Sequence, residues 1–196
     1  MVKNGANASA TDGAGYSAFG RAVVEGHVDV VRYLAEECNV NAKAKCGADL
    51  LEQIAAGGHL DCIQYLVDEW GVDVKDRSTS MRMLEAAVGS IDVVRYLVGD
   101  CGINVSGDTA YAVLTKAGAE GRIDVTRYLA GECGADVNAR DSRGITALMA
   151  AAGRGQISVV RHLMGSAGLM STQRLGTGSQ HSWKPQQEAI SMPSAI

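Results

Sequence analysis

The order of apolar and polar residues recurs along the chain at a spacing near 32 residues. In the segment Val28–Leu34, which reads VDVVRYL, apolar residues take the first, third, fourth and seventh places. Much the same order returns as LDCIQYL, IDVVRYL, IDVTRYL and ISVVRHL, which end at Leu66, Leu97, Leu129 and Leu163. This spacing predicts a short helix that is buried on most of its circumference, with Arg32 on the outside.

A second short helix is predicted before each of these segments. It reads AFGRAVV in the first copy and ALMAAA in the last. A glycine follows it in every copy: Gly26, Gly58, Gly89, Gly121 and Gly155. Glycine commonly ends a helix because it adopts the left-handed conformation without strain. One such helix pair is too small to bury its own apolar face, so the copies must stack, and the pattern predicts an all-α solenoid.

The last copy carries a family resemblance. Its segment Asp141–Gly155, DSRGITALMAAAGRG, resembles the D-x-x-G-x-T-P-L-H-x-A-A-x-x-G pattern of the ankyrin repeat. The preceding Gly134–Ala139, GADVNA, is similar to the linking segment of that family. The resemblance covers about residues 5–168. It implies an α-solenoid of about five stacked ankyrin-type helix-turn-helix repeats with short connecting β-turns.

No copy has the complete T-P-L-H tetrapeptide of the family. The corresponding places read SAFG, DLLE, MRML, AVLT and TALM. The resemblance implies that Thr and His of the tetrapeptide hold the turn together by hydrogen bonds, so we expect a looser array than a consensus one. Three turns between repeats are two residues shorter than the last turn, and we expect their tips to project less.

The chain divides into three parts. Residues 1–10 resemble the end of a truncated preceding repeat, because Gly5–Asp12 aligns without gaps with Gly134–Asp141. The ankyrin repeat domain covers residues 11–168, with repeats at about 11–42, 43–74, 75–105, 106–138 and 139–168. Residues 169–196 carry no apolar period and are predicted to form a disordered C-terminal tail.

Composition and charge narrow the classes of function. The 196 residues carry a net charge of −4, which argues against a basic nucleic-acid-binding surface. No apolar run reaches the ~18 residues that span a bilayer, and the first residues lack the core of a signal peptide. The five cysteines include no C-x-x-C pair. We therefore expect an intracellular protein, cytoplasmic or nuclear, with no nucleic-acid or membrane partner, no disulfide framework and no metal site.

The tyrosines, His162 and Cys46 could in principle take part in chemistry, but their places in the sequence favour structural roles. One ladder of equivalent positions is expected in the core: Tyr33, Tyr65, Tyr96, Tyr128 and His162. Cys46 has no recognisable His/Asp or His/Asn partner, and the chain contains no P-loop, HExxH or G-x-S-x-G motif. We therefore expect no enzyme, with no catalytic residue, no cofactor and no small-molecule substrate.

The resemblance also implies a continuous concave surface of turn tips and helix ends that binds other proteins. Transferred to this sequence, it gives seven candidate protein-binding residues: Tyr16, Glu25, Tyr111, Glu120, Arg143, Ile145 and Arg154. Tyr16 and Tyr111 stand just before their tetrapeptides, where an exposed tyrosine would anchor a partner. The alternative is that each ring packs against an adjacent tip.

The leading hypothesis is a non-enzymatic scaffold or adaptor that binds an unidentified protein or peptide partner. The alternative is a detached regulatory or targeting segment of a larger multidomain enzyme or channel whose chemistry lies outside this chain. A third hypothesis rests on the final Ser194-Ala195-Ile196, which resembles the short C-terminal ligands of PDZ-type domains.

Overall fold

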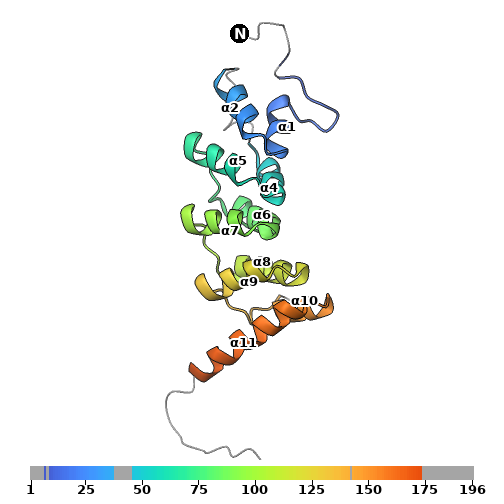
Figure 1. Cartoon of the computed structure of the whole chain (residues 1–196), viewed down its shortest axis with the longest axis vertical. Helices are drawn as coiled ribbons and strands as arrows, with labels where there is room; N and C mark the ends of the chain where they lie inside the picture. The colour runs from blue at the N-terminus through green and yellow to red at the C-terminus, as the bar shows by residue number, and fades with distance from the viewer. Residues whose placement is uncertain (1–6, 8, 38–45, 142, 174–196) are drawn as a thin grey trace, which may run out of the picture.

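The helices of the protein stack in pairs along one long axis. The computed structural model describes residues 7, 9–37, 46–141 and 143–173. Within this part of the chain there are helices and one isolated β-bridge, between Thr11 and Ser17, but no strand. Figure 1 shows the helices as two columns. The predicted all-α repeat solenoid is therefore confirmed.

Each repeat contributes one helix to each column. The helix-one column consists of α1 (Ala18–Val24), α4 (Ala48–Gly57), α6 (Arg77–Ala86), α8 (Gly107–Glu120) and α10 (Ala147–Gly153). The helix-two column consists of α2 (Val28–Glu36), α5 (Leu60–Gln64), α7 (Ile91–Arg95), α9 (Ile123–Arg127) and α11 (Ile157–Gln173). Three helices of the second column continue into a π-helical turn: η1 (Tyr65–Glu69), η3 (Tyr96–Asp100) and η4 (Tyr128–Glu132).

The connections into the third and fourth repeats are extended segments that lie on the core. Val72 and Val74 in one connection, and Ile103 and Val105 in the other, are buried and alternate with exposed residues. This alternation is the pattern of an extended chain with one face on the core. These connections therefore contribute apolar surface to the array instead of projecting from it.

The first helices of the third and fourth repeats begin earlier than the sequence suggested. Helix α8 starts at Gly107, several residues before the AVLT segment that begins at Ala112. Tyr111 consequently lies inside α8 and not in a turn tip, in contrast to the prediction. The physical reason is the short connection, which has fewer residues for a hairpin and leaves the tip positions to continue the helix.

Four of the five helix-ending glycines adopt a conformation that a side chain would strain. Their φ angles lie between 71° and 76°: Gly26, Gly58, Gly121 and Gly155. Gly89 differs, because it ends the 3₁₀ turn η2 (Ala87–Gly89) in the repeat where the leucine spacing falls to 31 residues. At Gly121 the next repeat also leaves no room for a side chain, because a Cβ atom there would overlap the side-chain amide of Gln156.

The core lies between the two columns and runs through the whole array. Phe19, Leu51, Leu84, Leu114 and Leu129 are among its fully buried side chains. Burying a side chain of this size stabilises the fold by about 1.5–3 kcal/mol. Every repeat supplies such residues to one continuous cluster, so neighbouring repeats depend on each other for burial.

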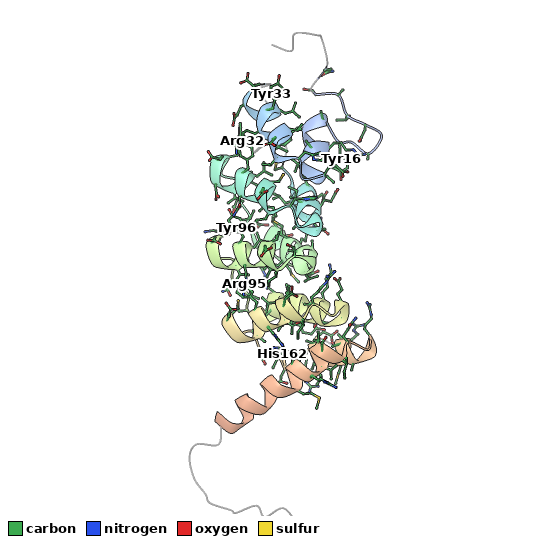
Figure 2. The ribbon with its side chains drawn as sticks, in the orientation of Figure 1. Tyr16, Arg32, Tyr33, Arg95, Tyr96 and His162 are labelled. Atoms are coloured by element: carbon green, nitrogen blue, oxygen red, sulfur yellow. The ribbon has the colours of Figure 1, made fainter. Side chains whose placement is uncertain are left out.

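Three of the four tyrosines of the ladder lie in the core. Figure 2 labels one of them, Tyr96, and the exposed Tyr33. Tyr65, Tyr96 and Tyr128 are 5%, 7% and 8% exposed, whereas Tyr33 is 62% exposed. The predicted core position is therefore wrong for Tyr33, because in the described part of the chain no helix-two segment precedes α2 and covers it. His162 is half-buried, and burial lowers its pKa.

The C-terminal helix extends past the predicted end of the repeats. Helix α11 continues to Gln173, which differs from the disordered tail expected from residue 169 onward. Residues 174–196, with the final Ser194-Ala195-Ile196, lie outside the described residues, as does most of the segment 1–10.

Candidate protein-binding surface

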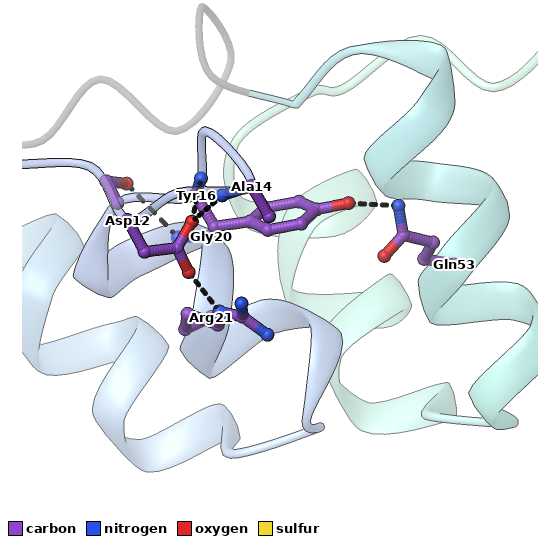
Figure 3. Close-up of polar contacts among 7 residues, drawn as sticks. Asp12, Ala14, Tyr16, Gly20, Arg21 and Gln53 are labelled. Atoms are coloured by element: carbon purple, nitrogen blue, oxygen red, sulfur yellow. Dashed lines mark hydrogen bonds and ion pairs between the residues drawn. The ribbon is translucent and has the colours of Figure 1, made fainter.

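The first repeat begins with a tight turn built around Asp12 (Figure 3). The Asp12 carboxylate accepts hydrogen bonds from the backbone N–H groups of Ala14 and Tyr16, both at 2.9 Å. Its second oxygen pairs with the Arg21 guanidinium at 2.5 Å. The Tyr16 N–H and then Arg21 hold the pKa of this carboxyl below its usual value. The charged form of Asp12 therefore fixes the shape of the tip.

The last repeat has the same turn around Asp141. Its carboxylate accepts hydrogen bonds from the backbone N–H groups of Arg143 and Ile145, both at 2.8 Å. The Arg143 guanidinium lies 3.0 Å from the other oxygen, and its side chain remains 80% exposed. The backbone N–H of Ile145 and then Arg143 lower the Asp141 pKa. Two of the candidate binding residues thus stand on a turn whose backbone is fixed.

Tyr16 joins the first repeat to the second. Its hydroxyl accepts a hydrogen bond from the Gln53 side-chain amide on α4. The Arg21 guanidinium lies 5.1 Å from the centre of its ring. Figure 3 shows the ring spanning from the turn to α4. The alternative to partner contact was packing against an adjacent tip; the ring instead reaches Gln53 on helix α4, and it is half-buried with an exposed part.

Three other candidates lie at the C-terminal ends of helices in the helix-one column. Glu25 follows α1, Glu120 ends α8, and Arg154 follows α10. All three side chains are exposed. Glu120 has a weak ion pair with Arg122, at 3.9 Å. Tyr111, the remaining candidate, is half-buried within α8.

A charged cluster between α4 and α6 was not predicted. The Arg82 guanidinium lies 2.5 Å from Asp49 and 2.5 Å from Glu52. Glu52 and Asp49 occupy the His and Thr places of the family tetrapeptide, in the copy that reads DLLE. The sequence contained one sign of this cluster: two consensus residues are replaced by carboxylates in one copy, and the next copy carries an arginine. The cluster links two repeats and leaves partly exposed charges in the middle of the column.

An open hollow lies between the starts of α6 and α8. It has a volume of about 490 Å³ and is lined by Lys75, Arg77, Asn104 and Asp108, among others. Arg77 and Asp108 form an exposed ion pair at 3.5 Å. The hollow therefore offers charges of both signs to a ligand from outside.

The buried cysteines do not have the ionisation state of a nucleophile. Burial raises the pKa of Cys46 to about 12 and that of Cys62 to about 11. Both thiols therefore stay protonated near neutral pH, whereas the thiolate is the nucleophilic form. Over the described ranges, no group of three or more His, Cys, Asp or Glu side chains is placed to bind a metal ion. No helix in the same residues is long and apolar enough to cross a bilayer.

A row of stacked helix pairs with similar structure defines an α-solenoid repeat protein. The family model for ankyrin repeats (3 copies) matches residues 1–78, 21–109 and 82–173, and the chain therefore belongs to the ankyrin repeat family. No curated protein matches the chain. Ankyrin repeats generally mediate protein–protein interaction, and no finding supports the alternative of a detached segment of an enzyme or channel.

Proposed function

We propose that this protein is a non-enzymatic interaction module that binds a protein or peptide along the helix-one column. The binding surface would consist of the two Asp-based turns and the exposed helix ends between them. The observation that carries the proposal is the combination of fixed turn backbone and exposed side chains. Arg143 projects from a turn held by Asp141, and Glu25, Glu120 and Arg154 are exposed at ends of helices in the same column.

The residues of this surface suit different parts of an interface. Tyr16 is held by Gln53 and Arg21, so it would lose little conformational entropy when a partner covers its exposed part. Arg143, Glu120 and Arg154 would contribute charge complementarity, which mainly sets specificity and the association rate.

The proposed partner is a protein and not a nucleic acid, and the proposed location is inside the cell. The net charge of −4 opposes binding to a phosphate backbone. The Arg82 cluster and the hollow beside Arg77 place charges of both signs along the column. Such a mixed surface fits the polar surface of another protein better than a uniformly anionic ligand.

Charge reversal on two faces tests the proposal. The full chain and its Glu120→Lys and Glu69→Lys variants would be immobilised and used to capture proteins from a cell lysate, with identification by mass spectrometry. Glu69, at the end of η1 in the helix-two column, is the matched control because it is also an exposed glutamate at the end of a helix. We expect Glu120→Lys to lose specific partners that Glu69→Lys retains. Retention by both variants, or equal loss from both, would contradict the proposed surface.

A further inference from the structure

The two ends of the array expose side chains that the interior repeats bury fully or in part. At the N-terminal end, Tyr33 is 62% exposed, although its equivalents in the next three repeats are at most 8% exposed. Val30, on the same helix α2, is 47% exposed. Its equivalents are fully buried: Cys62, Val93, Val125 and Val159. Figure 2 places Tyr33 at the outer end of the helix-two column.

Two interior tyrosines, Tyr65 and Tyr128, are each covered by an arginine of the preceding repeat. The Arg32 guanidinium lies 4.8 Å from the centre of the Tyr65 ring, and Arg95 lies 4.6 Å from the centre of the Tyr128 ring. This distance and the aromatic face give a cation–π contact. In the repeat that precedes Tyr96, the position equivalent to Arg32 holds Gln64, so this contact depends on the residue at one repeating position.

Two interior tyrosines also bind a carboxylate of the preceding repeat. The Tyr65 hydroxyl donates to Glu36 at 3.3 Å, and the Tyr96 hydroxyl donates to Asp68 at 2.9 Å. The first three repeats therefore each present to the next one a helix-two surface that receives a tyrosine. Tyr33 is the same side chain without such a surface among the described residues.

The C-terminal end presents the other half of this interface. Met164 on α11 is 62% exposed, whereas its equivalents Ala35 and Ala130 are 2% and 8% exposed, and Val67 and Val98 are half-buried against the core. Ile157 is also 62% exposed, although its interior equivalents are partly buried against the core. Arg161 is exposed at the repeating position where Arg32 and Arg95 cover a tyrosine.

We propose that two copies of this chain associate head to tail through these end faces. The N-terminal face, Val30 and Tyr33, of one copy would pack on the C-terminal face, Ile157, Arg161 and Met164, of another. The occupant is a second copy because the two faces are the two halves of an interface that one chain already makes between its own repeats. Arg161 would cover Tyr33 as Arg32 covers Tyr65. This contact goes beyond the proposed partner binding and leaves the helix-one column open.

Such an interface is heterologous, because different surfaces meet, and one copy can bind a neighbour at each end. Variants that block one face per copy should therefore fail to associate alone but should associate with each other. Tyr33→Asp would disable only the N-terminal face, and Met164→Asp would disable only the C-terminal face. Asn104→Asp is the matched control, since it adds the same charge at an exposed loop position away from both ends.

Sedimentation velocity of the 196-residue chain at increasing concentration tests the proposal. The wild-type chain and Asn104→Asp are expected to form dimers and longer species as concentration rises. Tyr33→Asp and Met164→Asp are each expected to remain monomeric alone, with unchanged helical circular dichroism. An equimolar mixture of these two variants is expected to form a dimer that does not grow, because one intact face of each kind remains. Arg161→Ala, which removes only an exposed side chain, should weaken wild-type association.

Three results would overturn head-to-tail association. The first is a wild-type chain that stays monomeric at every concentration, which would mean that another partner or another segment covers the end faces. The second is a mixture of Tyr33→Asp and Met164→Asp that stays monomeric while the wild type associates. The third is self-association of either variant alone, which would indicate a symmetric contact between like faces.

Discussion

Single carboxylates fix the two turns that flank the proposed binding surface. Asp12 and Asp141 each accept two backbone N–H groups and pair with one arginine. These contacts need the ionised carboxylate, because a protonated acid loses acceptor strength and the charge that attracts the guanidinium. The shape of both turns therefore depends on a single protonation state.

Asp141→Asn should remove this contribution in a pH-dependent way. The Asp141 pKa in the folded chain lies below its ordinary value of 3.8, so ionised Asp141 stabilises the fold above that pH. The contribution is lost as the pH falls through the folded-state pKa. We expect the wild type to have the higher Tm at neutral pH and the difference to shrink in acid, in thermal unfolding followed by circular dichroism. Asp100→Asn, at an exposed position, is the control. A Tm difference that stays constant in acid would contradict this role.

At the scale of the helix, the glycine between the paired helices has a different role in different repeats. Gly121 combines a φ of 74° with close contact to Gln156 of the next repeat. Gly89 has neither feature: it ends a 3₁₀ turn, and a Cβ atom there would meet its nearest neighbour, Arg122, at 3.8 Å. The two positions look alike in the sequence and differ in their physical demand for glycine.

Alanine at these two positions should therefore have unequal effects. Gly121→Ala is expected to destabilise the protein by about 1–2 kcal/mol, because alanine is strained in the left-handed conformation and its Cβ displaces Gln156. Gly89→Ala is expected to change stability by less than about 0.5 kcal/mol. Urea unfolding of both variants measures the difference. Equal losses would contradict the distinction between the two turns.

The sequence predicted the helix pairs because their apolar residues and glycines recur at fixed places. It did not predict features that depend on connection length or neighbours. The π-helical turns, such as Tyr65–Glu69, have no distinct residue pattern, and the ion pairs of Arg82 join residues from different copies. Tyr111 was expected in a tip because its place in the repeat was transferred without allowance for a shorter connection. Tyr33 has the same local sequence as buried Tyr96, and only its place at the end of the array exposes it.

At the scale of the whole molecule, stability comes from contacts between neighbouring repeats. Leu97 is fully buried in the central repeat. Leu97→Ala should cost about 2–5 kcal/mol, through lost burial and the cavity that remains. We expect a lower urea midpoint, since loss at one repeat weakens the support of its neighbours. A change below about 1 kcal/mol would contradict tight stacking at this position.

Partner binding and self-association are proposed to use different parts of the array. The helix-one column would hold a partner along its side, and the end faces would join copies along the long axis. Because these surfaces share no residue, partner binding and self-association can be measured independently. The charge variant Glu120→Lys should leave sedimentation unchanged, and Tyr33→Asp should leave partner capture per chain unchanged.

Hydrogen exchange of the full chain with a captured partner tests the binding surface most directly. We predict slower exchange at the two Asp-based turns and at the C-terminal ends of α1, α8 and α10 when the partner is bound. We also predict unchanged exchange in α5 with η1 and in α7 with η3. Protection confined to those helix-two segments, with none at the turns and helix-one ends, would contradict the proposed surface.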